Sequence, residues 1–179
     1  DNNVININRP VTVAGNNATL NNIALNITSD DVTVNGLTMN VDELPFAINV
    51  DNANNVVIAN NTIDYNDNGT TDAYAIFANG ADSLTVSGNN ISYEGNTTGS
   101  TVNNAVYIGN SDNVSFEDND LDITVPSSYV PWAEVPAGSG NWVSSPVSEG
   151  IVFDNCSDLS VKDNGIEIDY NNVIGSYDT

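Results

Sequence analysis

The stretch that decides the fold is NNVVIANNTIDY, residues 54–65. Apolar and polar side chains alternate along it, a pair of asparagines interrupts, and the alternation then resumes. The same phrase returns as DSLTVSGNNISY (82–93), DNVSFEDNDLDI (112–123) and SDLSVKDNGIEI (157–168). Because successive side chains of a strand point to opposite faces, each copy predicts two short strands joined by a corner.

Six copies align, and four columns of apolar residues run through them. The first column is Val11, Val32, Val56, Leu84, Val114 and Leu159, and the second is Val13, Val34, Ile58, Val86, Phe116 and Val161. The third is Ala18, Met39, Ile63, Ile91, Leu121 and Ile166, and the fourth is Leu20, Val41, Tyr65, Tyr93, Ile123 and Ile168. A further strand precedes most copies, as in FAINV (46–50), YAIFA (74–78), AVYIG (105–109) and GIVFD (150–154).

Three short strands per copy, with no helical spacing of apolar residues, predict an all-β chain wound as a parallel β-helix of about six coils. Equivalent strands would stack about 4.8 Å apart and enclose one shared core. We expect a single domain over residues 1–179, forming a fragment of a longer surface protein, with a long loop insertion at 125–149. A sandwich of hairpins is the rival fold, but it would not repeat one ordered phrase between connections of changing length.

One corner position carries asparagine in five of the six copies. The residues there are Asn16, Leu37, Asn61, Asn89, Asn119 and Asn164. The residue before each is Gly, Asn or Asp, the types that tolerate the left-handed backbone of a tight corner. We expect the asparagines to form a structural ladder of amide hydrogen bonds along the core, interrupted at Leu37.

The strongly negative charge of the chain excludes some classes of binding partner and favours others. Two basic residues face 24 acidic ones, giving a formal net charge of −22, and there is no histidine. Such a surface cannot neutralise rows of phosphates, so nucleic acid is not expected as a partner. No apolar run approaches the roughly 20 residues needed to cross a bilayer, so this segment is not expected to insert into a membrane. Divalent cations suit the charge better.

The phrase VxIxxNxI, repeated on coils of this length, resembles the right-handed parallel β-helix proteins of the pectate-lyase-like superfamily. The Asn- and Asp-rich style is most similar to adhesin-like surface proteins of methanogenic archaea. The resemblance covers almost the whole chain and implies a right-handed, single-stranded β-helix, which agrees with the usual hand of parallel crossovers. It also implies an extracellular, cell-surface location, adjoining domains in the same polypeptide, and attachment to a glycan or a partner cell surface.

Catalysis is not expected, and no catalytic residue is assigned. Lyases of the superfamily use an arginine base with calcium, and its hydrolases combine aspartate with histidine. Here Arg9 is the only arginine, and histidine is absent. The alternative is a polysaccharide hydrolase or lyase built on paired carboxylates, for which Glu117 and Glu167 are expected in one column and Asp64 and Asp122 in another. A purely structural spacer is the further alternative.

The insertion at 125–149 is the first candidate ligand site. It holds Tyr129, Trp132 and Trp142 together with four of the six prolines. Exposed aromatic faces suit sugar rings, and loops of this length are often functional. The alternative is that the aromatic side chains pack down as a lid over a sheet.

A weaker candidate is a calcium site in DYNDNGTTDAY, residues 64–74. Asp64, Asn66, Asn68, Thr70 and Asp72 match the ligand positions of an EF-hand loop. The twelfth position is Ala75 rather than glutamate, and Tyr65 is expected to point into the core. Calcium is therefore an optional cofactor, no cofactor is required, and an ordinary polar connection is the competing interpretation.

Overall fold

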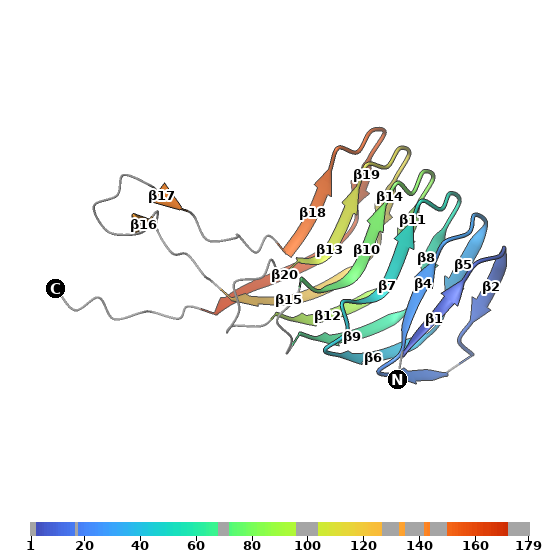
Figure 1. Ribbon diagram of the computed structural model, residues 1–179, viewed down its shortest axis with the longest axis horizontal. Coiled ribbons are helices and arrows are strands. Elements are labelled where there is room, and N and C mark those ends of the chain that lie inside the picture. The colour runs from blue at the N-terminus through green and yellow to red at the C-terminus, as the bar shows by residue number, and fades with distance from the viewer. Residues whose placement is uncertain are drawn as a thin grey trace.

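The chain winds as a right-handed parallel β-helix of six coils (Figure 1). The computed structural model describes residues 3–16, 18–67, 72–95, 104–126, 133–134, 142–143 and 150–171. Each coil contributes one strand to each of three parallel six-stranded sheets, here called sheets A, B and C. The fold predicted from the repeated phrase, with three strands per coil, is confirmed.

The sheets are named by their position in the coil. Sheet A contains β1 (Val4–Ile7), β4 (Ala24–Ile27), β7 (Phe46–Asp51), β10 (Tyr74–Asn79), β13 (Asn104–Gly109) and β18 (Gly150–Asp154). Sheet B contains β2 (Val11–Ala14), β5 (Val32–Asn35), β8 (Val57–Ala59), β11 (Thr85–Ser87), β14 (Ser115–Glu117) and β19 (Ser160–Lys162). Sheet C contains β3 (Thr19–Asn21), β6 (Thr38–Asp42), β9 (Thr62–Asn66), β12 (Asn90–Glu94), β15 (Asp120–Pro126) and β20 (Gly165–Asn171).

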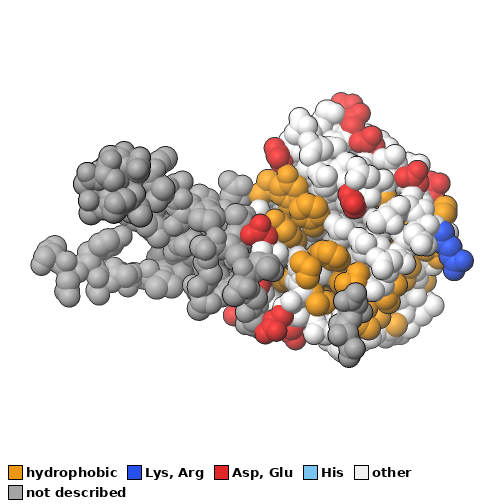
Figure 2. Space-filling view, viewed as in Figure 1, with side chains coloured by type: hydrophobic (Ala, Val, Ile, Leu, Met, Phe, Trp, Pro, Cys, Tyr) orange, Lys and Arg blue, Asp and Glu red, His pale blue; other side chains and the backbone are white. Residues whose placement is uncertain are grey.

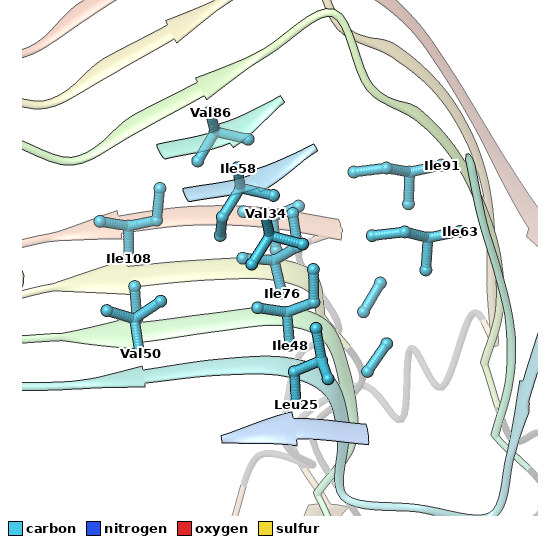
Figure 3. Close-up of a cluster of buried hydrophobic side chains, with 14 of the residues drawn as sticks. Leu25, Val34, Ile48, Val50, Ile58, Ile63, Ile76, Val86, Ile91 and Ile108 are labelled. Carbon is cyan, nitrogen blue, oxygen red and sulfur yellow. The ribbon is translucent and has the colours of Figure 1, made fainter. Parts of the chain in front are cut away.

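The apolar columns line one shared interior. The register of sheet B joins Val13, Val34, Ile58, Val86, Phe116 and Val161 in one file, as predicted. Its four central members are fully buried. Figure 3 shows side chains from all three sheets meeting in this core. Each fully buried Val, Ile or Leu stabilises the fold by about 1.5–3 kcal/mol, so the columns dominate folding.

The first coil differs from the predicted alignment. In sheet C, Leu20 rather than Ala18 pairs with Met39, so Leu20 occupies the third column, and Ala18 is exposed. The physical cause lies in the preceding corner. A side chain at Gly15 would meet the carbonyl oxygen of Gly36 at 1.9 Å, so Gly15 gives room for close backbone approach, and the left-handed position moves on to Asn16.

The later corners follow the prediction. Their left-handed residues are Gly36, Asn60, Gly88, Asp118 and Asp163, each with φ between 53° and 70°. Each of these residues is followed by the side chain that enters the core, which is Leu37 in the second coil.

The asparagine ladder runs from Asn61 to Asn164. The side-chain Oδ1 of Asn89 accepts hydrogen bonds from the backbone N–H and the Nδ2 of Asn61, both at 3.0 Å. Asn89 donates in the same way to Asn119, and Asn119 to Asn164. The backbone N–H of Leu37 donates to Asn61, so the side-chain ladder begins there.

Asn16 corrects the predicted ladder. The sequence places it in the same column, but it takes the left-handed corner position itself, with φ 45°, and its side chain is exposed. The two extra residues in the first corner therefore remove Asn16 from the core.

The end coils are less buried than the central ones. Ile5 in the first coil and Leu159, Val161 and Ile166 in the last are 40–47% exposed, although they belong to inward columns. The described residues place a neighbouring coil on only one side of each. Within the described residues, no helix has the length and hydropathy that a membrane crossing needs.

Candidate functional site

The side chains on the outer face of sheet A change from asparagines in the first coils to aromatic rings in the later ones. At one outward position, the register aligns Asn6, Asn26, Asn49, Phe77, Tyr107 and Val152. The first three form an amide ladder, in which Asn26 Nδ2 donates to Asn6 Oδ1 at 2.8 Å and Asn49 Nδ2 donates to Asn26 Oδ1 at 2.7 Å. The outer column therefore passes from amides to aromatic rings within one sheet.

The rings of Tyr74, Phe77 and Tyr107 contact one another. Together with Phe46, the strand partner of Tyr74, we call them the sheet A platform. Phe46 pairs with Tyr74, and all four side chains are half-buried. In Figure 2, hydrophobic side chains gather over β7, β10, β13 and β18 on this face. An apolar gathering on an exposed face marks a potential contact surface.

The platform rings contact one another in a defined way. Phe77 and Tyr107 stack with their centroids 5.1 Å apart and their planes 11° apart. Tyr74 packs at a tilt against both, with centroids 4.9 Å from Phe77 and 6.1 Å from Tyr107. Because ring carbons in contact lie about 3.5–4.0 Å apart, a 5.1 Å separation requires a lateral offset of the stacked rings. Part of each face therefore stays uncovered by its partner.

Gly109 and Asp154 set the position of Tyr107. A Cβ at Gly109 would lie 2.7 Å from both Cε1 and the hydroxyl oxygen of Tyr107, so glycine leaves the space over the strand that the ring occupies. The Tyr107 hydroxyl donates to Asp154 Oδ2 in the next coil at 3.0 Å. The ring is thus seated by a gap on its own strand and held by a carboxylate on β18.

The platform phenols stay protonated across the neutral range. Burial raises the pKa of Tyr107, and its hydrogen bond to the Asp154 carboxylate raises it further. Burial likewise raises the pKa of Tyr74, with a smaller contribution from the negative charge of Asp72. Both hydroxyls therefore remain neutral groups that can donate and accept hydrogen bonds.

The electrostatic setting of the platform is negative. The six strands of sheet A contain no Lys or Arg, and Asp51 and Asp154 end two of them. Lys162 lies on sheet B, where its Nζ is 3.0 Å from Glu117 Oε1. Hydrogen bonds from Lys162 first, and then from Ser160 and Ser115, lower the pKa of Glu117. No described cation therefore faces outward from the strands of sheet A.

The predicted insertion falls mainly outside the described residues. Its first two residues belong to β15, and β16 (Ala133–Glu134) pairs antiparallel with β17 (Trp142–Val143). Trp142 thus lies in a strand opposite Glu134. Tyr129 and Trp132 lie outside the described residues, so sugar binding at the insertion stays a prediction.

The proposed calcium ligands are only partly described. Asp64 and Asp72 are exposed and Asn66 is half-buried, while Asn68 and Thr70 lie outside the described residues. Tyr65 is buried, as expected from its inward position. Within the described part of the chain, no group of three or more Asp, Glu, His or Cys side chains is arranged to hold a metal ion.

The carboxylate columns differ from the prediction. Glu117 lies on sheet B opposite Lys162, whereas Glu167 lies on sheet C opposite Asp122, so the two glutamates do not share a column. Both residues face outward, but Glu117 follows the second apolar column, whereas Glu167 lies between the third and fourth, so the aligned columns already separate them. Asp64 and Asp122 do share an outward column, two coils apart, with Ser92 between them. All members of that column are exposed.

The sheet A platform was missed in the sequence, although its signal is present there. Once the inward residues of FAINV, YAIFA and AVYIG are assigned, alternation places Phe77 and Tyr107 at outward positions. Phe46 and Tyr74 share the parity of the inward Ile48 and Ile76, so alternation does not predict their part in the platform. The equivalent positions of the first coils hold asparagine, so the change from amide to ring was visible.

No protein-family model matches the chain, and no curated protein or solved structure matches it either.

Proposed function

We propose that this chain is a non-catalytic, adhesin-like domain of an extracellular surface protein, which attaches to carbohydrate through the sheet A platform. The observation that carries the proposal is the stacked, offset pair Phe77 and Tyr107 on the outer face of a solenoid sheet. The resemblance of the chain's repeated phrase to β-helix proteins of the pectate-lyase-like superfamily, and to adhesin-like proteins of methanogenic archaea, supports the same proposal.

The chemistry of the platform fits a sugar better than a purely apolar ligand. A pyranose ring offers an apolar C–H face and a rim of hydroxyl groups, and binding sites for such ligands combine aromatic area with a few polar groups. Here Tyr74 and Tyr107 supply rings with hydroxyls, and the column that holds Tyr107 also supplies the amides of Asn49 and Asn26. Stiff sheets hold these groups in place before the ligand arrives, which reduces the entropy lost on binding.

The test is a glycan-array screen of the wild-type chain and two variants. Phe77→Ala removes the centre of the platform and is expected to abolish the signal. Val57→Ala, which shortens a half-buried outward side chain on sheet B, is the matched control and is expected to retain it. Circular dichroism of each variant establishes that the fold is kept.

Two further variants separate the platform from the insertion. Trp132→Ala and Trp142→Ala are expected to leave the platform signal in place. Loss of signal in these variants alone would move the site to the insertion, and absence of any glycan signal would favour the structural spacer. Release of reducing ends from a bound glycan would instead support the polysaccharide-acting alternative.

A further inference from the structure

We infer that the sheet A platform takes an uncharged glycan chain lying along the helix axis, with its sugar rings on Phe77 and Tyr107 and its hydroxyls on the amides of Asn49 and Asn26. The inference rests on the proposed function and adds to it the charge class and the direction of the ligand.

The direction follows from the strand register. Asn26, Asn49, Phe77 and Tyr107 occupy equivalent outward positions on consecutive strands of sheet A. Consecutive strands lie about 4.8 Å apart, so these four positions span roughly 14 Å along the axis. A ligand running along the axis meets rings and then amides, whereas a ligand crossing the sheet meets only one member of the column.

The amides keep hydrogen-bonding capacity for a ligand. A side-chain amide has two N–H donors and two acceptor lone pairs. Asn26 uses one N–H toward Asn6 and one lone pair toward Asn49, both within the ladder. The ladder also fixes the orientation of each amide, so a row of sugar hydroxyls would meet groups that are already aligned.

The charge class follows from the groups around the column. Asp51 and Asp154 end strands of sheet A, these strands contain no Lys or Arg, and the whole chain carries a formal charge of −22. A polyuronate would bring its carboxylates against this surface without a counter-charge and would be repelled. A cationic glycan would be attracted by the entire acidic surface, without preference for this sheet. An uncharged chain alone depends on the rings and amides.

The experiment is isothermal titration calorimetry of the full chain with 1,4-linked hexasaccharides of glucose, of uronic acid and of glucosamine. The glucose hexamer is expected to bind with an affinity that does not change between low and high salt. The uronic acid hexamer is expected to bind at least about tenfold more weakly, and binding of the glucosamine hexamer is expected to disappear at about 1 M salt.

Variants test the direction. Phe77→Ala is expected to weaken binding of glucose trimers and hexamers alike, by about tenfold or more. Asn26→Ala is expected to weaken binding of the hexamer severalfold and binding of the trimer much less, because only the longer chain extends from the rings to the second amide, whereas the trimer feels only the lost bond between Asn26 and Asn49. Asn40→Ala is the control, since Asn40 Nδ2 makes the same kind of ladder bond, to Asn21 Oδ1 at 2.9 Å, on sheet C.

The outcomes separate this inference from the proposed function. Equal or tighter binding of the uronic acid hexamer through Phe77 would overturn the charge class while the platform stands. An equal effect of Asn26→Ala on trimer and hexamer would overturn the direction. If none of the three glycans binds in a Phe77-dependent way, the proposed function itself fails.

Discussion

Asparagine stabilises each coil from two kinds of position. At corners it takes the left-handed backbone conformation, as Asn52, Asn55 and Asn60 do in the third coil. In the core, Asn61, Asn89 and Asn119 are 1% exposed and bond to the next coil through both side chain and backbone. A buried amide is tolerated only when its hydrogen bonds are made, so this ladder ties the stacking of coils to one register.

Asn89→Ala is expected to lower the free energy of unfolding by about 2–4 kcal/mol. The substitution removes the acceptor of the Asn61 backbone N–H and also a donor to the carbonyl of Ile58. Urea denaturation measures the change. Asn90→Ala, one residue along and exposed, is the control and should change stability by less than about 0.5 kcal/mol. Equal effects of the two substitutions would mean that the ladder contributes nothing beyond an ordinary surface residue.

The buried tyrosines predict an alkaline limit to stability. Tyr93 is 1% exposed, stacks on Tyr65 with centroids 5.3 Å apart, and donates to the carbonyl of Ala73 at 3.0 Å. Burial, with the nearby charge of Asp67, raises the pKa of Tyr93 well above its ordinary value of 10.0. The unfolded chain therefore releases this proton at lower pH than the folded chain does.

The sign of the effect follows directly. Below pH 10 both states keep the proton and the stability is intact, and above it the unfolded state binds fewer protons. The free energy of unfolding should then fall with rising pH, by up to about 1.4 kcal/mol per pH unit for each such tyrosine. Tyr93→Phe should cost about 1 kcal/mol at pH 7 and make this slope shallower, as measured by urea denaturation between pH 8 and roughly 11. Unchanged slopes would contradict the assignment.

At the scale of elements, sheet A differs from its neighbours in what its outer face carries. The strands of all three sheets send alternate side chains to the core. Within the described residues, only sheet A assembles contacting rings on its outer face, from the neighbouring strands β10 and β13. The cluster depends on Gly109 as well as on the rings, because the Tyr107 ring occupies the space that a side chain at position 109 would fill.

Gly109→Ala should therefore act on binding more than on stability. Its Cβ would push the Tyr107 ring from its seat and weaken glycan binding severalfold, while the change in melting temperature stays small because Gly109 has an ordinary backbone conformation that alanine can adopt. Calorimetry with the glucose hexamer measures the affinity, and near-ultraviolet circular dichroism reports the displaced ring. Tyr107→Phe, which keeps the ring and loses the bond to Asp154, is the companion variant and should retain most of the affinity.

At the scale of the whole molecule, the sequence predicts the inward half of the structure far better than the outward half. Burial imposes one rule on every coil, so Val34, Ile58 and Val86 align from their spacing alone. The geometry of the first corner was not predicted, because the close approach between Gly15 and Gly36 is a contact between coils, which local spacing does not encode. Outward residues obey no shared rule. The aligned repeats put Phe77 and Tyr107 in one column, but the contacts of Tyr74 with both rings appear only in the structure.

The most direct test of the account is an amide NMR titration of the isotope-labelled chain with the glucose hexamer. The account predicts that the shifts change most in β7, β10 and β13, around Asn49, Phe77 and Tyr107, and extend along sheet A to Asn26. Changes confined to residues 127–149, or spread evenly over sheets B and C, would contradict it.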